Sequence, residues 1–124
     1  MNKPLRRTPM RRKSKKRAAR EASPEGREDA EYLAKVRSLP CCICEAFGEE
    51  QLSATTAHHV FHGRFSRSRT PDKMAIPLCD GHHQGDRDTS KLAIHRAKTT
   101  WAERYGEDHE YSAATQDRIE RMMF

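Results

Sequence analysis

The stretch Ile76-Pro77-Leu78-Cys79-Asp80-Gly81-His82-His83 decides how this chain folds, because a short apolar run leads directly into a pair of metal-binding side chains. That pair is Cys79-x-x-His82, and a pair of the same spacing, Cys41-x-x-Cys44, ends 35 residues before Cys79. Each short loop can turn both of its ligands onto one ion, and two such loops complete the closed tetrahedral site that structural zinc prefers. Four ordinary buried thiols are the alternative, and the matched spacings argue against it. We predict a structural Zn²⁺ held by Cys41, Cys44, Cys79 and His82, with Cys42 pointing away.

The composition makes such a metal site useful to the fold. Of the 124 residues, 35% are hydrophobic and 34% are charged, so the core is small, and small domains often depend on a metal or on disulfides. The positively charged N-terminus has no apolar segment behind it, and no apolar run approaches the length of a membrane span. We therefore expect a cytoplasmic protein without a membrane partner, whose reduced cysteines bind metal.

Positive charge is concentrated at the N-terminus. The net charge is +6, but residues 1–20 hold ten Lys and Arg residues and no acid, which leaves a net charge of −4 on residues 21–124. Blocks of like charge stay unfolded and commonly bind nucleic acid. We expect residues 1–22 to be a disordered basic tail that contacts DNA, although a solubilising tail is the plainer interpretation. The expected contacts are Arg6, Arg7, Arg11, Arg12, Lys13, Lys15, Lys16, Arg17 and Arg20.

Apolar periodicity and capping residues predict a small α+β domain over residues 23–124, expected as a monomer. Ser23-Pro24-Glu25 is typical of a helix start, and the residue before a proline disfavours helical backbone. Trp101 and Tyr105 stand one helical turn apart and are expected in the core. The predicted elements are a helix from Ser23 to before Pro40, a tight loop at 41–44, paired strands at 55–60 and 74–78, a helix or a broken helix opening at 80–83, and helices at 92–105 and 112–124.

Histidines beyond the zinc site point to a second centre. His58 is followed by His59, and in a strand adjacent side chains point to opposite faces. One of the two can bind a metal while the other accepts a proton from water, which is the division of labour that phosphodiester hydrolysis needs. His83 and His95 are further candidates, and His62 is a spare one whose plainer interpretation is a solvated loop residue.

Several of these segments resemble a known family. Ala57-His58-His59-Val60 and Ile76-Pro77-Leu78-Cys79-x-x-His82-His83, preceded by Cys41-x-x-Cys44, resemble the zinc-bearing HNH endonucleases of the ββα-metal (His-Me finger) superfamily. His83-Gln84-Gly85, Ala93-Ile94-His95 and Trp101-x-x-x-Tyr105-Gly106 are closer still to phage and prophage proteins of the Ref (recombination enhancement function) type. The resemblance covers about residues 30–106. It implies a ββα-metal core with a zinc knuckle and flanking helices, and a metal-dependent DNA endonuclease linked to recombination, acting alongside a recombinase filament.

The resemblance also assigns roles to single residues. His59 matches the general base, His58 matches the metal ligand before it, and His83 matches the ligand carried by the helix after the zinc loop. The last ligand is expected where Arg87 stands, so His95 replaces it, which requires an insertion at residues 84–94.

The resemblance also leaves the asparagine of the family to be replaced. Met74 stands at its position, and Asp72 and Lys73 are the nearest polar residues that can take over its catalytic role. The ion of this second site, held by His58, His83 and His95, is expected to be Mg²⁺ or Mn²⁺, or else Zn²⁺.

Two other functions stay open. A non-catalytic zinc-knuckle module would bind nucleic acid through the basic tail and would need the zinc site alone. An adaptor would bind a partner protein through the apolar face of the last helix. The number of metal sites and the activity of a His59→Ala variant distinguish these possibilities from a nuclease.

Overall fold

The metal-binding pairs of the sequence meet around a two-stranded antiparallel ribbon. In the computed structural model, which describes residues 14–61 and 71–123, β1 (Thr55–His58) pairs with β2 (Ile76–Cys79). Thr56 lies opposite Leu78 and His58 lies opposite Ile76, so Cys79 and His58 are delivered at opposite ends of the ribbon. The predicted pairing of two short strands is confirmed.

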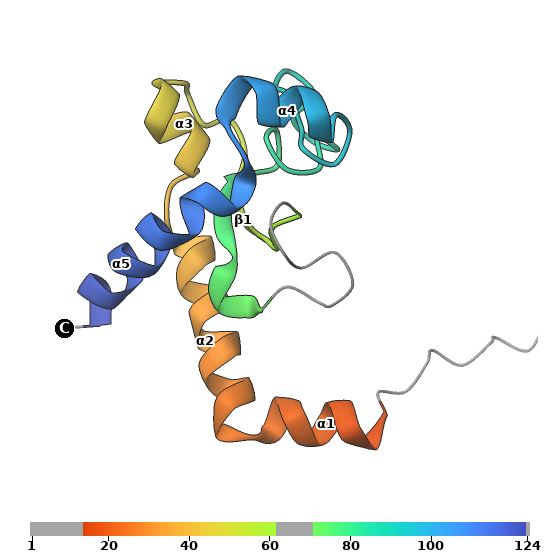
Figure 1. Cartoon of the computed structure of the whole chain (residues 1–124), viewed down its shortest axis with the longest axis vertical. Coiled ribbons are helices and arrows are strands. Elements are labelled where there is room, and N and C mark those ends of the chain that lie inside the picture. Colours follow the sequence, from red (N-terminus) through yellow and green to blue (C-terminus); the bar gives the residue numbers. More distant parts are fainter. Residues whose placement is uncertain (1–13, 62–70, 124) are drawn as a thin grey trace, which may run out of the picture.

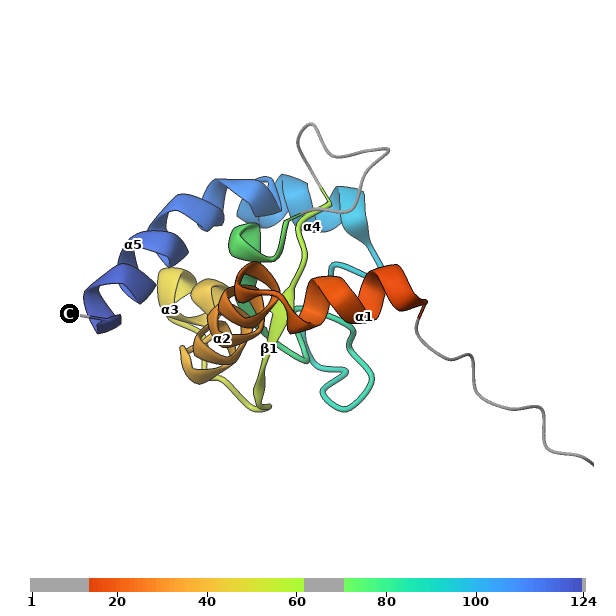
Figure 2. The same ribbon diagram turned by 90° about the horizontal axis from the view of Figure 1, so that it is seen from below.

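Helices surround this ribbon. In Figure 1, α3 and α4 lie at one end of the molecule and α1 lies at the other, and both views show α1 extending to the side opposite the C-terminus (Figures 1 and 2). No helix in the described ranges has the length and apolar character that crossing a membrane requires. The helical elements are α1 (Lys15–Ala22), α2 (Pro24–Ser38), α3 (Cys42–Phe47), η1 (Asp72–Met74), α4 (Lys98–Tyr105), η2 (Asp108–Tyr111) and α5 (Ser112–Met123).

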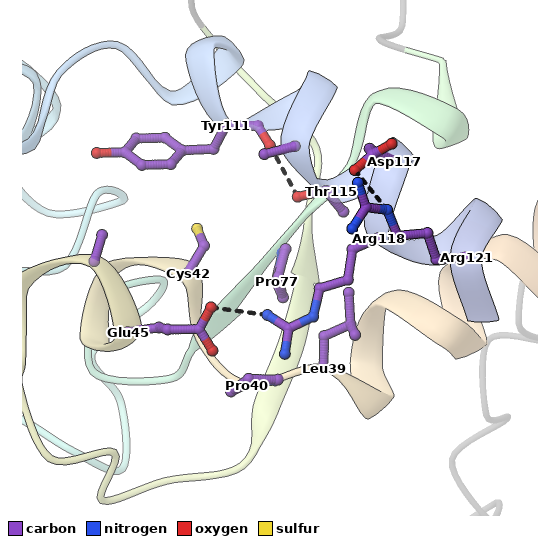
Figure 3. Close-up of a pocket in the computed structure, with 12 residues that line it drawn as sticks. Leu39, Pro40, Cys42, Glu45, Pro77, Tyr111, Thr115, Asp117, Arg118 and Arg121 are labelled. Atoms are coloured by element: carbon purple, nitrogen blue, oxygen red, sulfur yellow. Dashed lines mark hydrogen bonds and ion pairs between the residues drawn. The ribbon is translucent and has the colours of Figure 1, made fainter.

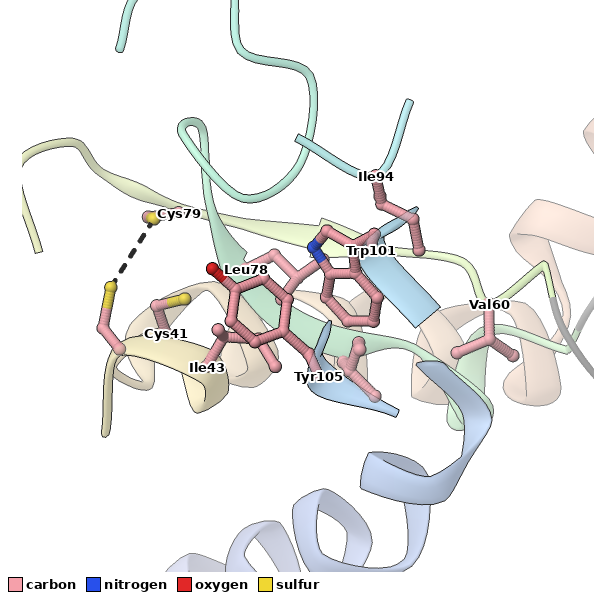
Figure 4. Close-up of a cluster of buried hydrophobic side chains, with 10 residues drawn as sticks. Cys41, Ile43, Val60, Leu78, Cys79, Ile94, Trp101 and Tyr105 are labelled. Carbon is pink, nitrogen blue, oxygen red and sulfur yellow. Dashed lines mark hydrogen bonds between the residues drawn. The ribbon is translucent and has the colours of Figure 1, made fainter. Parts of the chain in front are cut away.

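Both faces of the ribbon are covered, and β2 is buried over its whole length. Ile76 and Leu78 point to one face, where Trp101 and Tyr105 of α4 pack on them (Figure 4). Ala57 points to the other face, because neighbouring side chains of a strand alternate. There it meets a second cluster formed by Val36, Leu39 and Ile119, from α2, the residue after it and α5. The predicted core positions of Trp101 and Tyr105 are confirmed.

The helix predicted to begin at Ser23 is confirmed with its cap. The Ser23 hydroxyl accepts a hydrogen bond from the backbone N–H of Gly26 at 3.2 Å, and Pro24 occupies the first turn. The helix ends at Ser38, and Leu39 is extended, as the following proline requires.

Two segments expected as irregular are helical, and both predictions were wrong. Residues 15–22 form α1 rather than part of a disordered tail, with Ser14 accepting from the N–H of Arg17 at 3.1 Å. The expected tight loop at 41–44 instead opens α3, which ends at Gly48 in the left-handed conformation with φ 64°. Glycine readily adopts the left-handed conformation that commonly caps the C-terminus of a helix. The cap at Gly48 therefore favours a short helix where the sequence predicted a loop.

The segment after β2 also departs from expectation. Residues 80–84 form turns, residues 92–97 are not α-helical, and the next α-helix begins at Lys98. His83 is therefore held by turns and not by a helix, and a ββα-metal core is not confirmed. What the chain forms is a small α+β domain with a two-stranded sheet.

Candidate metal centres

Four side chains from the two predicted pairs converge on one point. Cys41, Cys44, Cys79 and His82 are all buried, and their ligand atoms lie within 4.8 Å of one another. His82 Nδ1 lies 3.5 Å from the sulfurs of Cys41 and Cys44 and 3.3 Å from that of Cys79. The sulfurs of Cys44 and Cys79 are 3.8 Å apart, as Figure 4 marks.

These separations match the edges of a zinc tetrahedron. Ligand bonds of about 2.3 Å to sulfur and about 2.0 Å to nitrogen give edges of about 3.7 Å between sulfurs and about 3.5 Å from sulfur to nitrogen. The buried cluster can therefore hold a metal ion such as zinc. Its four donors close the coordination shell, which is typical of a structural site.

Groups around this cluster fix its ligands. The backbone N–H of Cys41 donates to Gln51 Oε1 at 2.8 Å, and the Gln51 amide donates in turn to Thr55 at the start of β1. His82 directs Nδ1 to the sulfurs, while its buried Nε2 lies 3.4 Å from a carboxylate oxygen of Glu49 and makes no hydrogen bond within the described residues. The Glu49 carboxylate is thus near the ring without fixing its orientation.

The three thiols of the cluster differ in pKa, and a bound cation would displace the protons that they hold. A hydrogen bond from Cys79 lowers the pKa of Cys41, while that same bond and burial raise the pKa of Cys79 to about 12. Burial and the neighbouring Cys79 raise the pKa of Cys44 to about 11. Zinc binding by such a cluster releases protons and depends on pH.

A second cluster contains three imidazoles. The ligand atoms of His58, His83 and His95 lie within 4.8 Å of one another. His58 and His83 are buried and His95 is exposed, so this cluster opens to solvent on one side. Three protein ligands with an open side are typical of catalytic zinc, whereas four closed ligands are typical of structural zinc.

His58 offers one nitrogen to this cluster. Its Nε2 lies 2.8 Å from the buried carboxylate of Asp108 and donates to it, because an ionised carboxylate can only accept. Its Nδ1 is buried and has no hydrogen-bond partner within residues 14–61 and 71–123. A buried nitrogen without a partner is costly, and a bound ion would satisfy it. The residues present therefore fit a metal.

The tautomer of His83 follows from its neighbours. The Thr56 hydroxyl donates its one hydrogen to the carbonyl of Leu78 at 2.8 Å, so it must accept from His83 Nδ1, 2.7 Å away. The lone pair of His83 then lies on Nε2. Burial, together with the charges of His58 and His95, lowers the pKa of His83 to about 3, so the ring stays neutral and can bind a metal at physiological pH.

A folded loop brings His95 to the other two. The N–H groups of Ile94 and His95 each donate at 3.0 Å, to the carbonyls of His82 and His83 respectively. Gly85 makes this return possible with φ 69°, and a Cβ there would lie 2.9 Å from that of Ala93. Residues 84–94 thus return the chain so that His95 lies close to His58 and His83. Burial and the nearby His58 lower the pKa of His95.

His59 points away from this cluster to a different partner. Its Nε2 lies 2.7 Å from Asp72 Oδ1, and its side chain is 36% exposed, compared with 1% for His58. Because Asp72 accepts the proton on Nε2, the Nδ1 lone pair of His59 is left to act as a base. The two adjacent histidines therefore have different partners, Asp108 for His58 and Asp72 for His59.

Some predicted site residues lie elsewhere. Lys73 donates to Glu28 of α2 at 3.3 Å, and its ammonium faces α2 and not the histidines. Lys15, Lys16, Arg17 and Arg20 lie on α1 and are exposed. The remaining predicted contacts, Arg6, Arg7, Arg11, Arg12 and Lys13, and the spare candidate His62 lie outside the described residues.

Asp108 is a site residue that the sequence did not reveal. Its carboxylate is fully buried and accepts from His58 and from the N–H of Phe61 at 2.6 Å. It lies 50 residues beyond His58, in a short 3₁₀ helix with no motif around it. The one signal was a histidine whose second nitrogen needs an acceptor.

A large cavity lies away from both clusters. It measures about 600 Å³ and is bounded by α3, β2 and α5 (Figure 3). Its charged side chains are paired with each other: Glu45 with Arg118 at 2.8 Å and Asp117 with Arg121 at 3.2 Å. Cys42 lines this cavity and is not part of the zinc cluster, as predicted. Nothing among its lining residues resembles a catalytic centre.

Comparisons with known proteins give one match. A family model described as "Protein of unknown function (DUF968)" matches residues 17–121, which include both clusters. No curated protein and no solved structure matches the chain.

Proposed function

The chain belongs to the DUF968 family, whose description names no activity, and we propose from the geometry of its two clusters that it is a metal-dependent DNA endonuclease. One observation carries the proposal: an open cluster of three imidazoles includes His58, and the next residue in the chain, His59, has an imidazole 2.7 Å from the carboxylate of Asp72. The Cys3His cluster, whose His82 precedes His83 in the chain, serves as the structural site.

The proposed reaction is hydrolysis of a phosphodiester bond. His59 Nδ1 removes a proton from the attacking water, whose oxygen forms a bond to phosphorus. Asp72 keeps His59 in the basic tautomer and stabilises the imidazolium that results. The bond from phosphorus to the leaving sugar oxygen then breaks, and that oxygen takes a proton from solvent. A divalent ion held by His58, His83 and His95 would supply positive charge to the phosphorane and to the leaving oxygen.

The donor set argues for the kind of ion. Mg²⁺ prefers oxygen ligands, whereas imidazole nitrogens suit Zn²⁺ and other transition metals. Of the ions expected from the sequence, we therefore place Zn²⁺ ahead of Mn²⁺ and Mg²⁺. DNA as the substrate, and a recombinase filament as a partner, rest on the resemblance to Ref-type proteins and on the cations of the N-terminal segment.

Cleavage of supercoiled plasmid in Zn²⁺, Mn²⁺ or Mg²⁺ tests the proposal. We expect activity from the wild type, and losses of about 10²–10⁴-fold for His59→Ala, which removes the base. Asp72→Asn should lose activity without losing either metal. Asp117→Asn is the matched control, because Asp117 is an exposed acid that pairs with Arg121 on α5. Absence of cleavage by the wild type with all three ions would refute the proposal and favour the non-catalytic zinc-knuckle module, whereas full activity in His59→Ala would remove His59 as the base.

A further inference from the structure

Lys98 occupies a position that the fold does not explain. It is the first residue of α4, where the positive end of the helix dipole disfavours a cation. The first turn holds no acid, and no ion pair engages the Lys98 ammonium within the described ranges. The Lys98 ammonium lies over the ring of Phe61, with Nζ 5.0 Å from the ring centroid.

That ring joins Lys98 to the three-histidine cluster. The Phe61 centroid lies 4.9 Å from the ring centres of both His58 and His95. The ammonium is thus within about 10 Å of the His95 imidazole, on the solvent-facing part of the molecule, since Lys98 and His95 are both exposed. A nucleic-acid strand rises about 3.4 Å per nucleotide, so this distance corresponds to a few nucleotides at most.

We propose that Lys98 binds a backbone phosphate of the DNA strand that is cleaved at the three-histidine cluster. This inference rests on the proposed function for the identity of that cluster. Phe61 holds the ammonium by a cation–π contact, which keeps the charge near the cluster without neutralising it. The first turn of α4 has no side-chain cap, so its N–H groups can add to the attraction for the same phosphate.

Arg104 provides a matched control on the same helix. Its guanidinium lies over the ring of Tyr105, 6.0 Å from the centroid, at the other end of α4. Tyr105 contacts His82 of the zinc cluster, 5.4 Å between ring centres, and not the three histidines. Arg104→Gln therefore removes the same charge and the same kind of ring contact, but from the opposite end of the helix.

The test measures binding of a short DNA duplex to the full-length His59→Ala protein, with metal present, over a series of salt concentrations. Adding Lys98→Gln should weaken binding about tenfold, the size of one lost charged hydrogen bond. It should also lower the slope of log affinity against log salt by about 0.9. Lys98→Arg should restore both values, and Arg104→Gln should change the slope by much less.

Equal effects of Lys98→Gln and Arg104→Gln would overturn the assignment, as would an unchanged slope in Lys98→Gln. Melting curves separate a folding defect from a binding defect, because removing a cation from a helix N-terminus should leave the thermal midpoint unchanged or raise it. If the wild type cuts no DNA but Lys98→Gln still lowers the slope, the endonuclease proposal fails and the phosphate contact stands. If the wild type cuts and the slope is unchanged, Lys98 alone is misassigned.

Discussion

At the scale of single residues, Asp108 shows how a ligand of the three-histidine cluster is oriented. Its buried carboxylate accepts from His58 Nε2 at 2.8 Å and thereby turns Nδ1 toward the other imidazoles. Partners of this kind typically contribute 10- to 100-fold to metal affinity. A residue 50 positions away in the chain thus orients one imidazole of the three-histidine cluster.

Asp108→Asn should weaken metal binding at the three-histidine cluster about 10- to 100-fold, because an amide is a poorer acceptor and cannot balance charge on the His58 ring. Zinc at the cysteine cluster should remain. Metal titration by calorimetry on zinc-loaded protein measures the change, with Asp117→Asn on the exposed face of α5 as the control. Equal affinity in Asp108→Asn and the wild type would remove Asp108 from this role.

At the scale of elements, the sequence patterns were reliable where the chain itself supplies both ends of an element. α2 has its serine cap and a proline beyond its end, and the ribbon has two short β-prone runs. α1 departs from the expected disorder because alanine and arginine are good helix formers and the Arg17–Glu21 pair at 3.2 Å adds to the stability of the helix. Residues 80–97 depart from the expected helices because hydrogen bonds within the loop hold His95, and apolar periodicity does not encode such bonds.

The packing of α2 on α5 contains one unfavourable group, the Tyr32 hydroxyl. It is buried without a hydrogen-bond partner in the described part of the chain, and burial together with nearby Glu120 raises the pKa of Tyr32 to about 12. Tyr32→Phe should therefore leave the stability at neutral pH unchanged or raise it by about 1 kcal/mol.

The same substitution should change the response to alkali. In the wild type, the unfolded chain releases the phenol proton near pH 10 and the folded chain only near 12, so the contribution of Tyr32 is complete below pH 10 and is lost as the pH rises toward 12. Denaturant unfolding at several alkaline pH values compares the two proteins. A steeper alkaline loss in Tyr32→Phe than in the wild type would contradict this account.

At the scale of the whole molecule, the side chains that can hold a metal are part of the core. Cys41, Cys44 and Cys79 belong to the same buried cluster as Trp101 and Tyr105, so α3, β2 and α4 converge on the zinc ligands. A structural zinc contributes about 10–16 kcal/mol of apparent binding free energy, compared with about 5–15 kcal/mol for the stability of a typical domain.

Cys79→Ser should consequently abolish the cooperative thermal transition, and so should a strong chelator acting on the wild type. Cys42→Ser is the matched control, because Cys42 is a neighbouring, partly buried thiol outside the cluster, and it should keep both zinc and the transition. Calorimetry together with zinc analysis gives the answer. A Cys79→Ser protein that melts cooperatively would show that the apolar core suffices.

If the proposed function is right, the N-terminal residues 1–13 contribute to DNA binding. Residues 1–13 carry six cations and no acid, so deleting them lowers the net charge from +6 to 0. DNA affinity should fall and its salt dependence should flatten, because each lost phosphate contact lowers the slope by about 0.9. Cleavage at low salt and saturating protein should persist. Filter binding across a salt series provides the measurement, and an unchanged slope would assign DNA binding to the folded domain alone.

The adjacency of His82 and His83 ties the two clusters together. One peptide bond separates a zinc ligand from a ligand of the second ion, and the carbonyls of both residues hold the loop that delivers His95. We therefore expect occupancy of the two sites to be linked, and by the same factor in each direction. On the proposed function, zinc that orders the segment around His82 and His83 would also prepare the site of hydrolysis. A newly made or metal-starved chain would then hold DNA through its cations and remain unable to cut it.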